Sequence, residues 1–414
     1  MYNKIKIALY SLLSTVNISF VGSMRVSEVL VMLWAPFVYD RRDFTTYPYL
    51  RKIVMALLLL LFFQVVTDIV VGTAPADYFR GWASILVSLL SFIVLFKLFN
   101  SYEGILLYVG MVMLRNIFYT DDIVDSDMSY FKFKMVPILS SLVYLLCAYF
   151  YRRGNIKAVL GVLLGYALTC VSFDSRSTAV VFFISAIIIY FFNSGLVITR
   201  AKLIVFSILA AGFFQVAYIF YVDAVLANDF GGEHARAQLQ RLENPYNPFE
   251  LLMTGRGETF AAATAIADAP VFGHGSWAKD HTLKYYQILL MFHDEELNLE
   301  KAYAKDQLIP SHSILMGAWI NCGVGGFLAV ALLFGLLMKV GFYMIRNAQE
   351  VALYPVIVLM TIGLIWTFAF SPFQHLRFSV PATGAILLST YYDFVYGEAP
   401  EPEPPAMLPP LQYR

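Results

Sequence analysis

Long apolar segments recur along this chain, and they limit the folds that it can adopt. A helix needs about 20 apolar residues to cross a bilayer, and about twelve segments are candidates. Because backbone polar groups must be satisfied within the hydrocarbon, the sequence predicts an all-α polytopic membrane protein with about twelve transmembrane helices. The second and eighth segments are short, and the second is also compatible with a re-entrant segment. The candidates run near 5–23, 26–39, 53–71, 81–99, 104–119, 135–151, 156–173, 177–192, 203–222, 313–340, 354–371 and 378–396.

The composition supports a membrane protein and excludes several other classes. Charged residues make up 14% of the 414 residues, whereas a soluble domain has roughly 25%. The net charge of zero argues against nucleic acid as a partner. The three cysteines lie inside apolar segments and form neither a disulfide framework nor a zinc pattern. The first segment lacks a small-x-small cleavage site, so we expect an uncleaved span rather than a signal peptide.

The distribution of basic residues predicts the orientation of the chain. With the amino terminus inside, the cytoplasmic loops contain more Lys and Arg than the outside loops, as membrane proteins usually do. Twelve spans then place both termini in the cytoplasm. The outside loops and the adjacent helix ends still carry several basic residues, and their presence on that side needs an explanation. These are Arg25, Arg80, Arg115, Lys132, Lys134, Arg176 and Arg377.

One long polar loop divides the chain. Residues 1–222 are predicted to contain spans one to nine, and residues 312–397 spans ten to twelve. Residues 223–311 form the outside loop between them, with an alanine-rich helix near 259–269 and one or two amphipathic helices within 282–305. A loop of this length is usually functional or a partner surface. The proline-rich tail, 398–414, is expected to be extended and cytoplasmic.

Three residues on the predicted outside face carry the main functional hypothesis. Arg176 lies in a hydrophilic break between two spans, and its planar guanidinium matches phosphate geometry. Arg256 stands between two glycines, which allow close backbone approach to an anion. His312 follows Pro310 where the long loop re-enters the membrane, and histidine can act as a general base near neutral pH. Ordinary roles remain open: a salt bridge from Arg176 to Asp174, a surface turn at Arg256, and local hydrogen bonding by His312.

Three further residues are accessory candidates. Glu258 is close enough in sequence to orient Arg256 or to act as an acid or base. His274, between Gly273 and Gly275, is the strongest rival of His312 among the histidines of the long loop. Arg115 lies near the end of a span, where a buried charge is costly unless it is paired. The sequence contains no carboxylate-rich metal motif and no phosphate-binding loop, so we expect neither a metal nor another cofactor.

The order of short motifs resembles that of the O-antigen ligase and O-antigen polymerase superfamily of bacterial inner membranes. The likeness comprises Met24-Arg-Val-Ser-Glu28, Ser175-Arg176-Ser177, Gly255-Arg256, Pro270-Val-Phe-Gly-His-Gly275, His312-Ser313 and Gly323-Val-Gly-Gly326. The chain departs from the family pattern at Ser313, where asparagine is common. It also lacks the tryptophan that often follows the Gly-Arg step; Phe260 is the nearest aromatic residue there.

The resemblance implies a function in lipopolysaccharide or other polysaccharide biosynthesis. The chain would transfer a glycan from undecaprenyl pyrophosphate at the periplasmic face, as a metal-independent inverting glycosyltransferase. Arg176 and Arg256 would bind the pyrophosphate, and His312 would deprotonate the acceptor hydroxyl. A chain-length regulator or a flippase would be a natural protein partner.

Several functions remain open from the sequence. A polymerase would join lipid-linked repeat units, whereas a ligase would move the glycan onto lipid A core; a third outcome is transfer onto protein. From a different class, a lipid-linked oligosaccharide flippase or transporter would show repeated halves, but the halves of this chain do not look alike. A non-catalytic scaffold would tolerate loss of both Arg176 and Arg256. We favour the polymerase.

Overall fold

Helices make up nearly all of the regular structure in the part of the chain that the computed structural model describes. That part is 2–19, 23–119, 130–173, 175–195, 257–291 and 307–397, with 212, 215–216, 218–227, 236–237, 239–248 and 250–251. The helices are α1 (Tyr2–Leu12), α2 (Val26–Val38), α3 (Asp43–Thr46), α4 (Pro48–Val71), α5 (Pro75–Leu98), α6 (Tyr102–Phe118), α8 (Val136–Arg152), α9 (Ile156–Ser172), α10 (Arg176–Asn193), α14 (Gly257–Asp268), α15 (Lys284–Met291), α17 (Ile314–Asn347), α18 (Tyr354–Phe370), α19 (His375–Phe378) and α20 (Val380–Tyr396), with the 3-10 helix η1 (Leu13–Thr15) and the π-helix η2 (Phe131–Met135). Strands β1 (Asn17–Ser19) and β2 (Ser23–Arg25) form a small antiparallel hairpin.

Among the described residues, five helical segments are long and apolar enough to cross a membrane: α4, α5, the continuous helix of η2 and α8, α10, and α17. The helices α2, α9 and α18 are apolar but shorter. The predicted all-α class is therefore confirmed, and a membrane protein is supported. The predicted number of about twelve spans and the single long loop are not confirmed.

The outward faces of these helices are themselves apolar. On α4, less than half of the most apolar window is buried (44%), and Met55, Phe62 and Ile69 are each more than half exposed. Large exposed apolar surfaces are unfavourable in water. An apolar helix surface on both the inner and the outer side is what a helix needs when it packs against protein on one side and lipid on the other.

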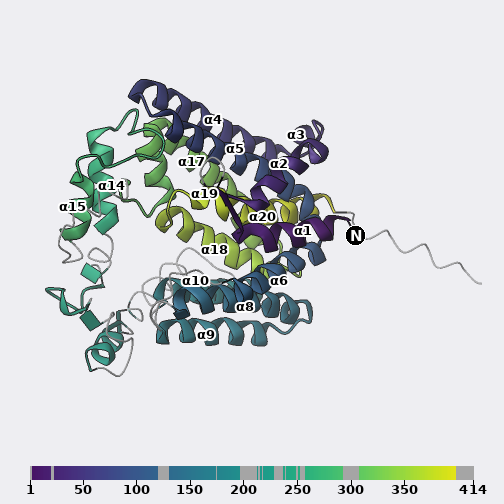
Figure 1. Cartoon of the computed structure of the whole chain (residues 1–414). Helices are drawn as coiled ribbons and strands as arrows, with labels where there is room; N and C mark the ends of the chain where they lie inside the picture. Colours follow the sequence, from purple (N-terminus) through teal and green to yellow (C-terminus); the bar gives the residue numbers. More distant parts are fainter. Residues whose placement is uncertain are drawn as a thin grey trace, which may run out of the picture.

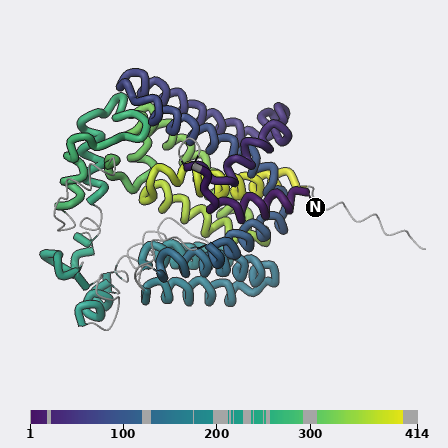
Figure 2. Tube along the Cα trace, viewed as in Figure 1, coloured from purple at the N-terminus to yellow at the C-terminus, as the bar shows by residue number. Residues whose placement is uncertain are grey.

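The helices form a layered bundle (Figure 1). Helices α4 and α5 pack together along one side, and α8, α9 and α10 pack together along the other. Helices α17, α18 and α20 lie between these groups, with α17 against α4, α20 against α5, and α18 against α10. Figure 2 follows the same path as a tube and shows α14 and α15 at the end of the bundle away from the amino terminus.

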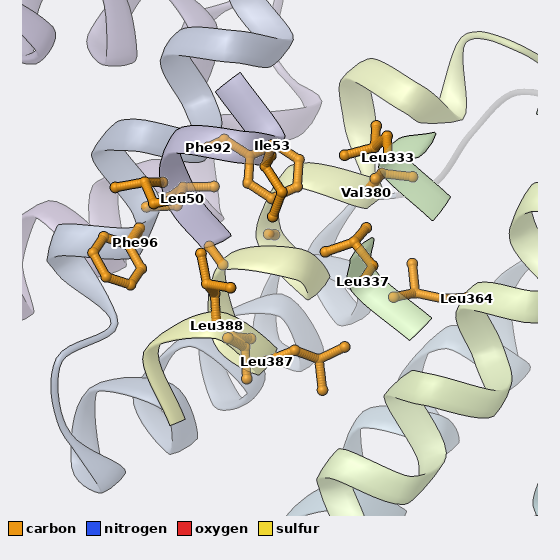
Figure 3. Close-up of a cluster of buried hydrophobic side chains, with 14 of the residues drawn as sticks. Leu50, Ile53, Phe92, Phe96, Leu333, Leu337, Leu364, Val380, Leu387 and Leu388 are labelled. Atoms are coloured by element: carbon orange, nitrogen blue, oxygen red, sulfur yellow. The ribbon is translucent and has the colours of Figure 1, made fainter. Parts of the chain in front are cut away.

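Close packing of side chains holds the layers together (Figure 3). Ile53 from α4, Phe92 from α5 and Leu337 from α17 are each fully buried in one cluster. Leu364 from α18 and Leu388 from α20 complete the contact among the five helices. Buried apolar side chains from the first and last thirds of the chain therefore fix the framework on which the ends of the helices are arranged.

The first predicted span is not one helix. The sequence predicts a span over 5–23, but α1 ends at Leu12, and the chain continues through η1 into the β-hairpin. The residues from Ser14 to Ser19 include Thr15, Val16, Asn17 and Ile18, which have low helix propensity. The apolar residues elsewhere in 5–23 explain the prediction, and the low helix propensity of these residues explains why it was wrong.

Helix α17 is distorted at Gly323, and a glycine-rich turn occupies the gap. Gly323 has φ 64°, ψ −166°, far from helical values. The turn at 270–275 packs into this position, with the His274 N–H donating to the Ile320 carbonyl at 2.6 Å and the Val324 N–H donating to the Pro270 carbonyl at 3.1 Å. A Cβ atom at Gly323 would lie 2.0 Å from the Val271 carbonyl oxygen. The contact thus requires glycine for both its space and its backbone conformation.

We expect Gly323→Ala to destabilise the protein by about 3 kcal/mol, because it adds left-handed backbone strain and a clash with the docked turn. Gly335→Ala in the same helix is the matched control, since nothing lies within 4 Å of the added Cβ atom and alanine is the better helix former. Thermal unfolding of both purified variants in detergent measures the difference. Equal stability of the two variants would contradict the assigned role of Gly323.

Candidate functional site

His312 is exposed, and the chain on both sides of it is held in place. Ser313 caps α17, its hydroxyl accepting from the Met316 N–H at 3.3 Å and donating to the Phe368 carbonyl at 3.2 Å. Before it, the Ile309 N–H donates to the Ala278 carbonyl at 2.9 Å. These contacts fix the backbone and leave the imidazole of His312 facing a cleft.

The cleft beside His312 has a volume of about 280 Å³ and a mixed polar and aromatic lining. Glu258 enters it from the first turn of α14, and Asn321 enters from α17. Trp277 and Phe373 provide aromatic rings. A few polar groups among apolar and aromatic walls are typical of small-molecule sites. We call this space the His312 cleft. The remaining lining residues are Ala278, Leu289, Gln307, Leu308, Ile309, Pro310, Ser311, Gly317, Ile320, Pro372 and Gln374.

A second cleft adjoins the first. It has a volume of about 370 Å³ and contains two arginines, Arg80 from α5 and Arg377 from α19. Trp277 and Gln374 line both spaces, so the two clefts meet at these residues. We call this second space the arginine cleft. Its other lining residues are Ser23, Met24, Ala83, Ser84, Val87 and Phe378.

Glu28 organises the wall of the arginine cleft. Its carboxylate is 5% exposed and accepts hydrogen bonds from Nε and Nη2 of Arg377. The same carboxylate accepts from the Arg25 N–H at 2.7 Å, at the start of α2. The guanidinium of Arg25 stacks on the ring of Phe378, 3.5 Å from its centroid. A two-point Arg–carboxylate pair defines geometry as well as charge, so Glu28 sets the position of α2 relative to α19.

His375 is a second histidine beside the site, and sequence reasoning missed it. Burial lowers the pKa of His375, and the charges of Arg25 and His312 lower it further. Its Nδ1 lies 3.3 Å from the Ser379 hydroxyl. In the sequence, His375 is a single histidine in the short connection between two predicted spans. Only its proximity to His312 and Arg25 in the structure identifies it as a neighbour of the site.

Asp68 holds the turn that carries Trp277. This buried carboxylate, near the end of α4, accepts from the Ser276 N–H and the Ser276 hydroxyl, both at 2.7 Å, and from the Trp82 indole at 2.8 Å. Trp277 itself has φ 58°, a left-handed conformation that is rare for a bulky residue. Such strain persists only where the surroundings impose it. The contacts of Asp68 with Ser276 therefore position the indole at the boundary of the two clefts.

His274, the predicted rival of His312, makes internal contacts. Its Nε2–H donates to the Ala265 carbonyl of α14 at 2.8 Å, and its ring packs against Tyr285 of α15. It is not among the residues that line the two clefts. These contacts give His274 a structural role in joining α14 and α15. Its accessory role in chemistry stays a prediction.

The predicted arginines lie elsewhere. Arg176 begins α10, and its guanidinium carbon lies 5.9 Å from the centroid of the Tyr221 ring. Arg115, near the end of α6, donates to the Ser14 hydroxyl and to the Asn116 side chain. Neither residue lines the two clefts as the described residues define them. Arg256, like Asp174, is outside the described residues. Joint action of Arg176, Arg256 and His312 stays a prediction.

Two motifs that are far apart in sequence contact each other. The turn beginning at Pro270 and the glycine-rich stretch at Gly323 pack together, and Glu258 joins His312 in one cleft.

Searches against models of known families and against curated proteins find no match to this chain. Among the described residues, no group of three or more His, Cys, Asp or Glu side chains could hold a metal ion.

We expect Asp68→Asn to destabilise the protein by about 1–3 kcal/mol, because one amide group cannot accept from all the donors that now point at the carboxylate. The loss should also increase hydrogen exchange in the turn at 270–277. Asp393→Asn is the control, since Asp393 is exposed. Unchanged exchange in the turn would show that Asp68 does not position it.

The lowered pKa of His375 predicts a pH dependence of stability. Below about pH 6.5, the ordinary value, the unfolded chain binds a proton before the folded protein does. The folded state therefore loses stability as the pH falls from about 6.5 toward the lowered pKa. Melting temperatures between pH 7.5 and 5 should fall less for His375→Gln than for the wild type. The exposed His281→Gln is the control, and parallel curves for wild type and His375→Gln would contradict the prediction.

Proposed function

We propose that this chain is a membrane glycosyltransferase that uses a polyprenyl-pyrophosphate-linked glycan, most simply a polysaccharide polymerase. The observation that carries the proposal is the His312 cleft, in which an exposed histidine and a carboxylate, Glu258, share a space with aromatic and amide side chains. Amide groups can both donate to and accept from sugar hydroxyls. The aromatic rings offer flat apolar surfaces for a sugar ring.

In the proposed reaction, the acceptor sugar supplies the hydroxyl that attacks the donor. The oxygen of this hydroxyl forms a bond to the anomeric carbon while the bond from that carbon to the phosphate oxygen breaks. The hydroxyl proton passes to a ring nitrogen of His312, and the bonding electrons leave with the pyrophosphate. One such displacement inverts the anomeric centre. Because the leaving group is already activated, the protein needs mainly to position the reactants and stabilise charge.

Positive charge near the leaving group completes the proposal. Arg176 and Arg256 have this role by resemblance alone, and the described structure adds Arg25, Arg80 and Arg377 near the His312 cleft. Glu258 lies within the same cleft as the proposed base, where a carboxylate can orient the imidazole or the acceptor hydroxyl. The ligase would use the same chemistry with a lipid A core acceptor, so the acceptor distinguishes it from the polymerase.

We expect His312→Ala to reduce glycan transfer by about 10²–10⁴-fold, the usual contribution of a general base. The test complements a host that lacks its own polymerase with wild type or variant and separates surface and carrier-linked glycans on gels. Wild type should restore long chains, and His312→Ala should leave single repeat units on the carrier. Arg176→Ala and Arg256→Ala should give the same defect.

His281→Ala is the matched control, because His281 is exposed and outside both clefts. Membrane levels of each variant must equal those of the wild type. Long chains that form without this protein but stay on the carrier would identify a ligase instead. If His312→Ala restores long chains as the wild type does, the proposed transferase mechanism is wrong.

A further inference from the structure

The arginine cleft has polar groups that make no hydrogen bond to any residue that the structure describes. Arg80 is 39% exposed in its side chain and approaches Asp77 only to 3.7 Å, beyond hydrogen-bond distance. Arg377 uses Nε and Nη2 for Glu28 and for the Ser23 carbonyl, which leaves Nη1 without a hydrogen bond to any described residue. The side chains of Ser84 and Gln374 likewise make none within the described part of the chain. Donors from α5, from α19 and from the residue before α19 thus face one space.

Two arginines line the cleft, and each has a carboxylate neighbour among the described residues. Glu28 offsets one of the two arginines Arg25 and Arg377, and Asp77 is shared between Arg80 and Lys279, which it meets at 3.1 Å. Arg80 and Arg377 each present a guanidinium group to the cleft. Fixed guanidinium groups with free donors favour phosphate or carboxylate oxygens over neutral groups.

The wall formed by α5 changes from charged to apolar along one helix face. Arg80, Ala83, Ser84 and Val87 lie at spacings of three, four and seven residues, which places them on the same side. Trp277 and Phe378 add aromatic surface. The cleft thus offers charge at one position and hydroxyl, amide and apolar groups nearby. This combination fits a sugar ring that carries an acidic group better than it fits a bare anion.

We propose that the arginine cleft binds a sugar unit bearing a phosphate or carboxylate group, with Arg80 and Arg377 contacting the anionic oxygens. Because this cleft meets the His312 cleft at Trp277 and Gln374, a glycan can occupy both. The assignment of the bound sugar unit to the acceptor glycan rests on the proposed function. The binding site itself rests on the cleft and its donors.

The test measures binding to the purified full chain in nanodiscs of neutral phosphatidylcholine by calorimetry. The probes are glucose 6-phosphate, glucuronate, uncharged glucose and inorganic pyrophosphate. The phosphate sugar or the sugar acid should bind at least about tenfold more tightly than glucose, since one hydrogen bond to a charged group has about this effect. Arg80→Gln should reduce that affinity to the level of glucose.

Matched variants separate the site from general effects. Arg51→Gln, an exposed arginine at the start of α4, should bind as the wild type does. Arg377→Gln leaves the buried Glu28 unpaired, so the double variant Glu28→Gln/Arg377→Gln tests the second arginine with the charge balance kept. It should lose affinity as Arg80→Gln does. His312→Ala should keep full binding, so failure of transfer and failure of binding are distinguishable.

Three results would overturn the proposal. The first is equal affinity for glucose and for both charged sugars. The second is tighter binding of pyrophosphate than of either charged sugar together with its loss in Arg80→Gln, which would make the cleft a site for the leaving group. The third is loss of charged-sugar binding when the nanodiscs contain phosphatidylglycerol, which would make it a lipid headgroup site.

Discussion

The contact between the turn at 270–275 and helix α17 is the constraint on which the candidate site depends. Two backbones meet there without side chains between them, since Gly273 and Gly323 each lack room for a Cβ atom. The contact joins the α14 region to the helix bundle, and Asp68 secures the same turn to α4 from the other side. Through these two attachments, Trp277 and Glu258 reach the cleft beside His312. The site is thus assembled by backbone fit and one buried carboxylate, on a framework of apolar helices.

The helical framework could be predicted because apolar length and composition report directly on it. Helices α8, α9, α10 and α18 begin and end within one residue of the predicted segments, whereas α4, α5 and α17 each extend five to seven residues beyond theirs at one end. The alanine-rich stretch forms α14 as its propensity indicates. The span predicted over 5–23 was wrong because hydrophobicity alone ignores the low helix propensity of Thr15, Val16 and Asn17. Hydropathy measures burial or lipid contact, and it does not specify which backbone conformation provides either one.

The site was only partly predictable. His312 and Glu258 were chosen from local patterns, and they do share a cleft. The sequence identified Arg80 and Arg377 only as basic residues on the predicted outside face, and His375 was missed. Their importance comes from neighbours that are distant in sequence. Glu28 illustrates the limit, because the side chain that pairs with its carboxylate is that of Arg377, 349 residues away. Propensity and spacing describe neighbours within a few turns, and long-range charge pairs require the tertiary fold.

That separation has a consequence for how the protein is made. Glu28 is synthesised among the first helices, and the guanidinium that neutralises it is added only when α19 emerges near the end of translation. Until then, the start of α2 carries a carboxylate without its partner, which opposes stable burial at that position. Final docking of α2 against α19 must therefore follow insertion of the last helices. The arginine cleft is completed at the same moment, so a chain that ends before α19 lacks both the Glu28–Arg377 pair and the finished wall of this cleft.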